Sequence, residues 1–485
     1  MAYFHGVYNS EIDTSLTAPI VGSAGLQVIF GTAPIHLSRD PYAAVNKPML
    51  CYSFAECQQN VGYSDNFKDF TLCQSIDACF RVFNVSPIIL VNVLDPSKAA
   101  HTTVNAAEDC PVVDGQVIYT KPYTLLETLE IKNGEAKLAD GDFIALHDND
   151  GNVQITIVDP TAAEATTLSV ASKSLNPAGV TRADVVGGVD AMTGKETGME
   201  LIRHIYPTLG MVPGLLLAPG WSGDAVVAAA IQAKTEAING VFVCNCLLDI
   251  PTDGENGAAV YTDAKVAKEK MGASSNHAVA LWPMVAVGDK IYHYSAMFGA
   301  LTAYTDASNA DVPYESPSNK DLRITTTVLA DGTEVVLDQQ QANDMLNANG
   351  ITTAINMNGF KSWGNSTAAY PSTTDPKDRW FAVRRFFDWD GNNFIRTYFQ
   401  KVDKPGNKRL IRSIVDSQNI VGNGYVAREY CAGYRLEFLE RENPATNLIN
   451  GHLTVHTFLA PYIPAEYIEN IREYDVNALT AALTA

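Results

Sequence analysis

The chain has 485 residues, of which 46% are hydrophobic and 18% are charged, which is typical of a globular protein with more than one core. Its formal net charge of −20 argues against non-specific binding to nucleic acid or to an anionic membrane, because both are polyanions. The eight cysteines include no CxxC pair, so we expect buried thiols rather than a disulfide framework.

The sequence predicts neither a secretion signal nor a membrane anchor. The N-terminus carries no basic region followed by an apolar one. No apolar run approaches the roughly 20 residues of a membrane-spanning helix, and AVALWPMVAV (278–287) is short and contains a proline. We therefore expect a soluble protein that is made in the cytoplasm and does not itself bind a membrane.

The first 17 residues interleave polar and apolar side chains without a sustained period, which favours an extended N-terminal arm (1–17). From residue 26 the pattern becomes strand-like in LQVIFGTAP, and a helix is expected around FAECQQNVG (54–62). The run PIILVNVLDP (87–96) is apolar throughout, which is typical of a strand in a sheet covered on both faces. An α/β layer is therefore predicted within residues 18–100.

Residues 101–190 change character. Short β-type segments such as GQVIYT and GDFIALHDNDGNVQITIVD alternate with NG, DG and DNDG turns, which predicts a small all-β insert. The α/β pattern then returns, with helices expected at 198–206 and at 224–240, ending at Gly240, and buried strands at 241–251 and 277–287. We therefore predict one central α/β domain, residues 18–100 and 191–345, which the insert interrupts.

A last unit of α+β type is predicted over residues 346–463. It follows QQQANDMLNANG (339–350), a helix that should end at its Asn-Gly pair. The unit contains the aromatic and arginine-rich stretch WGNSTAAYPSTTDPKDRWFAVRRFFDW (363–389) and ends with the alternating strand pattern of GHLTVHTFLAP (451–461). After two prolines, residues 464–485 should leave the core as a C-terminal arm.

The segment from Asp375 to Arg412 differs in charge from the rest of the chain. It holds ten basic and five acidic residues, a net charge of +5, which leaves −25 on the remainder. Such a segment either pairs with the acidic remainder of its own chain or meets an acidic partner, and the sequence leaves both possibilities open. Aromatic residues beside arginine can also stack on bases. More commonly they pack a core edge, and the arginines pair with carboxylates, here Asp378, Asp388 and Asp390.

Two motifs come close to catalytic signatures, and each lacks a residue that the chemistry requires. GGVDAMTGKET (187–197) has Val189 where a phosphate-binding loop needs glycine, and Glu196 where magnesium needs a Ser or Thr. PGWSGD (219–224) places its second glycine one residue too early for a nucleophile elbow at Ser222, so a helix cap is favoured.

Three further motifs are equally incomplete. The histidines of HLTVH (452–456) lie on a predicted strand, about 13 Å apart and too far for one zinc ion. GNGYVA (422–427) is a loose dinucleotide match, and HDNDGN (147–152) favours a hairpin turn over a calcium loop. No catalytic, metal-binding or cofactor-binding residue is predicted. The alternative from another class is a hydrolase that would use an Asp with Ser222, His204 or His277.

Several blocks, in the right order, resemble contractile phage tail sheath proteins. NANGITTAINMNGFKSWGNSTAAYPSTTDPKDRWFAVRRFFDW, FIRTYFQKVDKPGNKRLIRSIVDSQN, ENPATNLINGHLTVH and PAEYIENIREYDV are similar to the C-terminal part of that family. YFHGVYNSEI, GTAP (31–34), LLLAPGWSGDAVVAAAIQAK and YESPSNK (314–320) look like the family too. The resemblance covers nearly the whole chain, and the β-rich insert is its least diagnostic part.

The resemblance implies a structural subunit and not an enzyme. Such subunits stack as hexameric rings around a tail tube and contract to drive the tube through the target cell envelope, and relatives serve in tailocins and other contractile injection systems. It implies as partners further copies of the chain, the tail tube protein, and the baseplate and tail terminator proteins. The location would be the tail sheath of a virion assembled in the bacterial host cytoplasm. The central domain would have a subtilisin-like fold without a protease triad, and no cofactor is expected.

The family resemblance also implies that both arms add strands to the sheets of neighbouring subunits. The residues concerned would be Tyr3, Phe4, Val7, Tyr8, Ile12, Ile468, Ile471, Tyr474 and Val476. The spacing of Tyr467, Ile468, Ile471 and Tyr474 suits an amphipathic helix at least as well. Following the family, we predict a strand.

The aromatic and arginine-rich stretch is expected to be a structural hub of the C-terminal domain. Its members would be Trp363, Asp375, Arg379, Trp380, Arg384 and Arg385. In the family this domain faces the tube, so the candidates for contact with an acidic tube surface are Lys404, Lys408, Arg409 and Arg412. A noncontractile structural subunit, such as a fibre or tube protein, is the nearer alternative.

Overall fold

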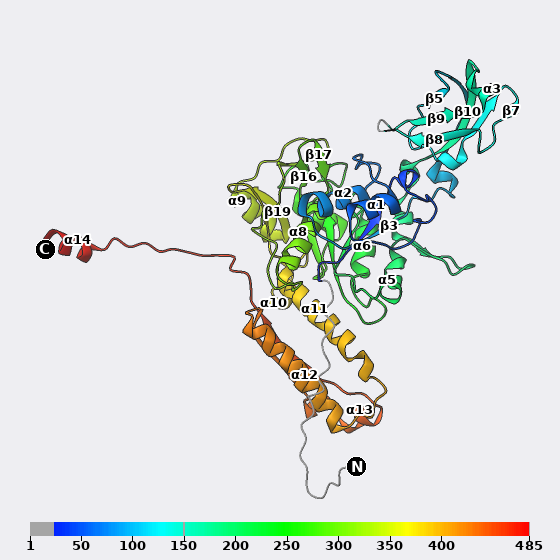
Figure 1. Ribbon diagram of the computed structural model, residues 1–485. Coiled ribbons are helices and arrows are strands. Elements are labelled where there is room, and N and C mark those ends of the chain that lie inside the picture. The colour runs from blue at the N-terminus through cyan, green and yellow to red at the C-terminus, as the bar shows by residue number, and fades with distance from the viewer. Residues whose placement is uncertain (1–23, 149–150, 485) are drawn as a thin grey trace, which may run out of the picture.

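The structure, a computed structural model, describes residues 24–148 and 151–484 (Figure 1). It is a mixed α/β protein with several sheets, and its largest sheet has eight strands in the order β2-β3-β1-β13-β14-β15-β19-β20. In that order the strands span Met49–Cys51, Ile88–Asn92, Gln27–Gly31, Leu215–Leu217, Asn245–Asp249, Ala278–Leu281, Ile351–Asn356 and Phe360–Trp363. The six inner strands are parallel, and the edge strands β2 and β20 are antiparallel to their neighbours.

Helices pack around this sheet, and together they form the central body (Figure 1). Strands β1, β3, β13 and β14 are buried along their whole length, which explains why their sequences are mainly apolar rather than alternating, with polar residues only at their ends. The strands predicted within 87–96 and 241–251 are confirmed as β3 and β14. The strand predicted within 277–287 is divided: Ala278–Leu281 is β15 of this sheet, but after the Trp282-Pro283 break Met284–Val287 joins another sheet. The helices of the body are α1 (Phe54–Val61), α2 (Leu72–Asp77), α4 (Arg182–Val186), α5 (Ile202–Leu209), α6 (Ala225–Ala233), α7 (Ala264–Met271), α8 (Tyr294–Ser308) and α9 (Gln339–Gln341).

Helix α8 is almost entirely buried and lies against the middle of the sheet. Its closest approach is at Gly299, where a Cβ atom would lie 2.7 Å from Gln27 Oε1 and 2.8 Å from Leu217 Cδ2. A glycine is therefore required there by packing rather than by backbone conformation.

Two predicted boundaries differ from the structure. The helix predicted to end at Gly240 ends at Ala233, because a turn with left-handed residues at Ala237 and Asn239 follows it. Strands β19 and β20 lie beyond residue 345 but pair in the central sheet, because the apolar Ile351–Asn356 adds directly to β15. The Asn349-Gly350 turn therefore leads back into the body and not into a new unit.

The insert consists of residues 102–175 and projects from the body (Figure 1). One sheet has the order β4-β10-β6-β7 and the other β5-β9-β8. Their strands span β4 Thr102–Pro111, β5 Gln116–Tyr119, β6 Glu130–Asn133, β7 Ala136–Lys137, β8 Phe143–His147, β9 Val153–Ile157 and β10 Thr167–Leu175, and the short helix α3 spans Pro160–Ala163. Inward-facing side chains such as Val117, Ile131 and Ile155 form a core separate from that of the body.

Two small sheets belong to the body in addition to the large one. The hairpin of β11 (Gly188–Val189) and β12 (Glu196–Thr197) contains Lys195, so the glycine-rich motif there is a hairpin and not a phosphate-binding loop before a helix. The other sheet has the order β17-β16-β18, with strands Lys290–Tyr292, Met284–Val287 and Thr326–Val328.

The C-terminal unit, residues 376–461, extends from the body as two long helices backed by a hairpin (Figure 1). Its elements are α10 (Pro376–Arg379), α11 (Phe381–Tyr398), α12 (Lys408–Ala427), β21 (Cys431–Glu437), α13 (Ala445–Ile449) and β22 (His456–Pro461). GNGYVA lies inside α12, so its glycines form no nucleotide-binding loop. Beyond it, residues 462–475 form neither helix nor strand, and the chain ends in α14 (Val476–Thr484).

Candidate assembly surfaces

The predicted hub lies mostly around the start of α11. The Arg379 guanidinium stacks over the rings of Trp380 and Tyr370, 4.1 and 4.6 Å from their centroids. Asp375 caps α10 by accepting a hydrogen bond from the Lys377 main chain. Trp363 lies at the end of β20 instead, where its indole N–H donates to Asn343 Oδ1.

Two consecutive arginines of the predicted hub have different partners: Arg384 pairs within the C-terminal unit, and Arg385 holds α11 against the body. Arg384 donates to Asp378 (3.2 Å) and Asp388 (3.0 Å). Arg385 is only 3% exposed, and it pairs with Asp306 of α8 and donates to the Ala24 carbonyl at 3.0 Å. The intramolecular pairing that the sequence left open therefore applies to these two residues.

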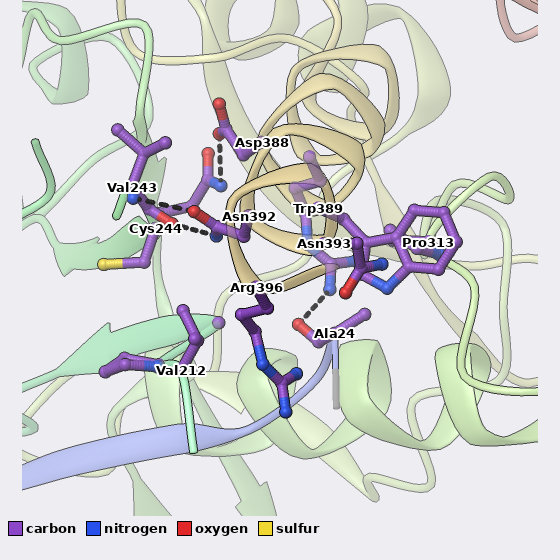
Figure 2. Close-up of a pocket in the computed structure, with 14 residues that line it drawn as sticks. Ala24, Val212, Val243, Cys244, Pro313, Asp388, Trp389, Asn392, Asn393 and Arg396 are labelled. Carbon is purple, nitrogen blue, oxygen red and sulfur yellow. Dashed lines mark hydrogen bonds between the residues drawn. The ribbon is translucent and has the colours of Figure 1, made fainter. Parts of the chain in front are cut away.

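The next turns of α11 contact the end of the central sheet (Figure 2). The side-chain amide of Asn392 donates to the Val243 carbonyl and accepts from the Val243 N–H, as a neighbouring strand would. Asn245 Nδ2 donates to Asp388 at 2.9 Å. The cavity enclosed here, between Val212, Cys244 and Arg396, is about 30 Å³. That volume holds one or two water molecules, far below the roughly 300 Å³ of a typical ligand pocket.

The residues considered for a hydrolase lie in separate places. Ser222 pairs with Asp249 (3.1 Å), His277 with Asp388 (3.1 Å) and His204 with Glu196 (2.6 Å). Within residues 24–148 and 151–484, no histidine hydrogen bonds to Ser222, so no nucleophile–base pair forms there. The same part of the chain holds no cluster of three or more His, Cys, Asp or Glu arranged to bind a metal, and no helix long and apolar enough to cross a membrane.

The interior of the C-terminal unit contains a polar network that sequence reasoning missed. Tyr434 of β21 donates to Asp390 of α11 at 3.0 Å, and Gln418 of α12 donates to Tyr434 at 2.6 Å. Burial raises the pKa of Asp390 to about 7, while the hydrogen bond from Tyr434 opposes the shift. The position of Asp390 one helical turn after the apolar Phe386 indicates a buried carboxylate, but its partners come from distant parts of the sequence.

Strands β21 and β22 form a sheet of only two strands. The outer edge of β21 is covered at Leu436, whose N–H and carbonyl both hydrogen bond to the Asn419 side chain of α12. Among the described residues, no main-chain hydrogen bond reaches the other edge of β22. The face of the hairpin, with Phe387 of α11, borders an open groove of about 450 Å³. The unit therefore carries one strand edge available for pairing.

The C-terminal arm leaves the molecule next to the hub. Glu466 accepts a hydrogen bond from Arg379 Nη2 at 3.1 Å. Past this contact the apolar side chains are open to solvent, and Tyr467, Ile468, Ile471 and Tyr474 are 70–86% exposed. The predicted arm residue Val476 begins α14 and is 62% exposed, whereas the N-terminal arm residues, Tyr3, Phe4, Val7, Tyr8 and Ile12, lie outside the described residues. The helix that the spacing of 467–474 suits does not form, and no strand forms there either.

The four basic residues considered for tube contact cluster around the start of α12. Lys404 lies in the preceding loop, and Lys408, Arg409 and Arg412 lie in the first turns of the helix. All four are exposed, and none forms an ion pair with another described residue. Their charge is therefore not neutralised by a neighbouring carboxylate, in contrast to that of Arg384 and Arg385.

Comparison of the chain with known proteins identifies relatives of similar sequence and structure. No family model matches the chain. The chain is 27% identical to the tail sheath protein of Burkholderia phage BcepMu over 464 residues, which cover 94% of this chain and 93% of that protein. It is 26% identical to the tail sheath protein of Escherichia phage P2 over 302 residues, 59% of this chain and 69% of that protein.

Two solved structures share the fold. One is the sheath complex of the PVC extracellular contractile injection system in its contracted state, with a TM-score of 0.58 and 14% identity, covering 99% of both chains. The other is the contracted helical sheath of the anti-feeding prophage, with a TM-score of 0.55 and 15% identity, covering 98% of this chain and all of that one. The chain is therefore similar along nearly its whole length to phage tail sheath proteins, and it shares its fold with the sheath proteins of contractile injection systems.

Proposed function

We propose that this subunit polymerises as stacked hexameric rings around a tail tube, and that contraction drives the tube through the envelope of a bacterial host. The observation that carries the proposal is that one chain has both features: a terminal arm with exposed apolar side chains, and a β22 strand edge with which no other described strand pairs. The sheath would form part of a virion assembled in the host cytoplasm. A tailocin or another contractile injection system is the alternative particle.

In this proposal the arms link neighbouring subunits. A two-stranded sheet is marginally stable alone and gains main-chain hydrogen bonds from each added strand. The arm residues Ile468, Ile471 and Tyr474 would pair along β22 of a second copy and bury apolar side chains in the groove beside Phe387. Such main-chain links tolerate rotation of the bodies that they join, which a contracting lattice requires.

In this proposal the central body, the insert and the C-terminal unit have separate roles. The central body would have a subtilisin-like fold, the insert would be a separate small domain, and the C-terminal unit would face the tube. The unpaired charges of Lys404, Lys408, Arg409 and Arg412 support an acidic tube surface as their partner. The baseplate and tail terminator proteins would meet the two ends of the polymer.

Contraction in this proposal needs no nucleotide. The extended sheath would be a kinetically trapped state, and contraction would release free energy through new contacts between subunits, a switch between two packings of one chain. Among the described residues the phosphate-loop-like motif (187–197) lies in the β11–β12 hairpin and the dinucleotide-like motif (422–427) lies inside α12, so neither adopts a nucleotide-binding geometry.

Electron microscopy of the purified full chain at high concentration tests the arm linkage. We expect wide hollow six-fold tubes, with or without co-expressed tube protein. Two deletion variants, lacking residues 1–17 or 464–485, should form none. A full-length variant with Ile468, Ile471 and Tyr474 changed to Asp should also fail to polymerise.

A matched control changes two exposed apolar residues outside the arms, Met192 (96% exposed) and Val336 (80% exposed), to Asp. This control should still polymerise. Two results would contradict the proposal. In one, the full chain stays monomeric when the tube protein is present. In the other, both deletion variants form normal tubes.

A further inference from the structure

The insert meets the central body through a cluster of four rings. His36 lies in a 3-10 turn of the body (Ile35–Leu37) and packs against Phe70, also of the body, with ring centroids 5.8 Å apart. From the insert come Tyr123, 5.5 Å from the His36 ring, and His147 at the end of β8, 5.3 Å from it and nearly perpendicular. Two imidazoles therefore face each other across the boundary between insert and body.

Each of these imidazoles carries a buried nitrogen without a hydrogen-bond partner: Nδ1 of His36 and Nε2 of His147. The His36 side chain is also almost enclosed, with 8% of its surface exposed. A neutral imidazole needs only one donor, and its other nitrogen is an acceptor. Protonation would turn an unpartnered nitrogen into a buried N–H donor and add a charge, and both changes are unfavourable without a partner.

The nearby carboxylates are already engaged. Asp148 follows His147 and accepts hydrogen bonds from the main chain and side chain of Asn152. Asp69 accepts from the Tyr123 hydroxyl at 2.8 Å. Neither carboxylate forms an ion pair with His36 or His147 in the described structure. A charged His36 would therefore find no carboxylate partner in the closed contact, whereas His147 lies beside Asp148 and main-chain acceptors of His36 and Thr124.

Burial, together with the smaller effect of the neighbouring His147 ring, lowers the pKa of His36 to about 3. Burial also lowers the pKa of His147, while Asp148 and main-chain hydrogen bonds to His36 and Thr124 oppose that shift. Burial, followed by the hydrogen bond to Asp69, raises the pKa of the Tyr123 hydroxyl to about 12, so this group stays neutral across the same range.

We propose that the His36–His147 contact is a pH-sensitive clasp that holds the insert against the central body while both imidazoles are neutral. Protonation of either ring opens the contact. The insert then moves on its two connections to the body, at the ends of β4 and β10, and keeps its own core.

The direction and size of the effect follow from linkage. An exposed histidine titrates near pH 6.5, so the closed state binds fewer protons than the open state below that pH. The clasp is therefore fully formed above about pH 6.5 and weakens as the pH falls toward 3. From the change at His36 alone, lowering the pH from 7.5 to 5.0 shifts the closed-to-open ratio by about 30-fold.

Hydrogen–deuterium exchange of the full chain at pH 7.5 and 5.0 tests the clasp. Light scattering first confirms that the sample is monomeric. The labelling times are scaled to correct for the pH dependence of intrinsic amide exchange. Peptides covering residues 33–38 and 143–148 should lose protection at pH 5.0 by up to about 30-fold. Peptides from β3 and β14 should not change. The variants His36→Phe and His147→Phe keep a ring of similar size that cannot be protonated, and each should reduce the pH response.

The control variant His452→Gln changes an exposed histidine and should respond as the wild type does. Equal protection of the wild-type contact peptides at both pH values would overturn the proposal. So would an unchanged response in a double variant that carries both Phe substitutions. If the Phe variants do not fold, the wild-type titration still decides the question.

Discussion

Arg385 of α11 and Asp306 of α8 form an ion pair whose side chains are 3% and 1% exposed. The same arginine donates to the carbonyl of Ala24, so three segments far apart in the sequence meet at one guanidinium. The contact joins the C-terminal unit to the helix that lies against the middle of the central sheet. It fixes how the two largest parts of the subunit are oriented.

Arg385→Met should therefore destabilise the protein strongly. It leaves Asp306 charged and buried without a partner, for which we expect a loss of about 3–5 kcal/mol in the free energy of unfolding. Urea denaturation measures this change in the free energy of unfolding. The double variant Arg385→Met/Asp306→Leu should recover much of the loss because no buried charge remains. If the double variant is as unstable as the single one, hydrogen bonding to Ala24 matters more than charge.

Gly422 allows α12 to approach β21 closely. A Cβ atom at this position would overlap the ring of Tyr434. We expect Gly422→Ala to destabilise the C-terminal unit by about 1–3 kcal/mol, because the ring must shift in a packed core. Gly424 of the same helix faces a looser site, where a Cβ would lie 3.4 Å from the end of the Arg428 side chain. Gly424→Ala should be neutral or stabilise the helix by up to about 1 kcal/mol, and thermal denaturation of both variants compares them.

Asp390 should make the C-terminal unit less stable as the pH rises. Its pKa in the folded chain, about 7, lies above the ordinary value of 3.8, so the folded state binds more protons between these values. The stability that this carboxyl contributes is full below about pH 4 and is lost as the pH rises through 7. The slope approaches about 1.4 kcal/mol per pH unit.

Hydrogen exchange of β21 and α12 between pH 5 and 8 measures this slope locally. Asp390→Asn should abolish it, since the amide can still accept the hydrogen bond from Tyr434 but cannot ionise. Asp403→Asn, at an exposed position, should leave the slope unchanged. A wild-type unit as well protected at pH 8 as at pH 5 would contradict the prediction.

Charge reversal at the start of α12 tests the tube contact. Changing Lys408, Arg409 and Arg412 to Glu should abolish assembly templated by the tube protein, because the proposed acidic surface would then repel the helix. Co-sedimentation with assembled tubes measures it. A control with the same change in charge reverses Lys47, Lys68 and Lys195, which are exposed on the central body. Equal loss in both variants would indicate a general effect of net charge rather than a contact of α12.

Much of the architecture follows from local patterns. The apolar run at 87–96 and the strands near 245 and 278 were predictable because a strand covered on both faces is mainly apolar rather than alternating. The positions of β19 and β20 were not, because membership of a sheet depends on pairing with β15 and not on the segment itself. Several ordered blocks of sequence, rather than any motif, indicated the family.

The sequence by itself determined many of the helices and strands of the α/β body and the β-rich character of residues 101–190, since periodicity and turn residues act over a few neighbours. Only the tertiary structure decided which side chains share an environment. Asp390, Gln418 and Tyr434 are brought together by the packing of α11, α12 and β21, and His36 meets His147 only because the end of β8 lies against the body. Residues 464–475 form neither helix nor strand, because a strand needs a partner edge and no described strand pairs with them.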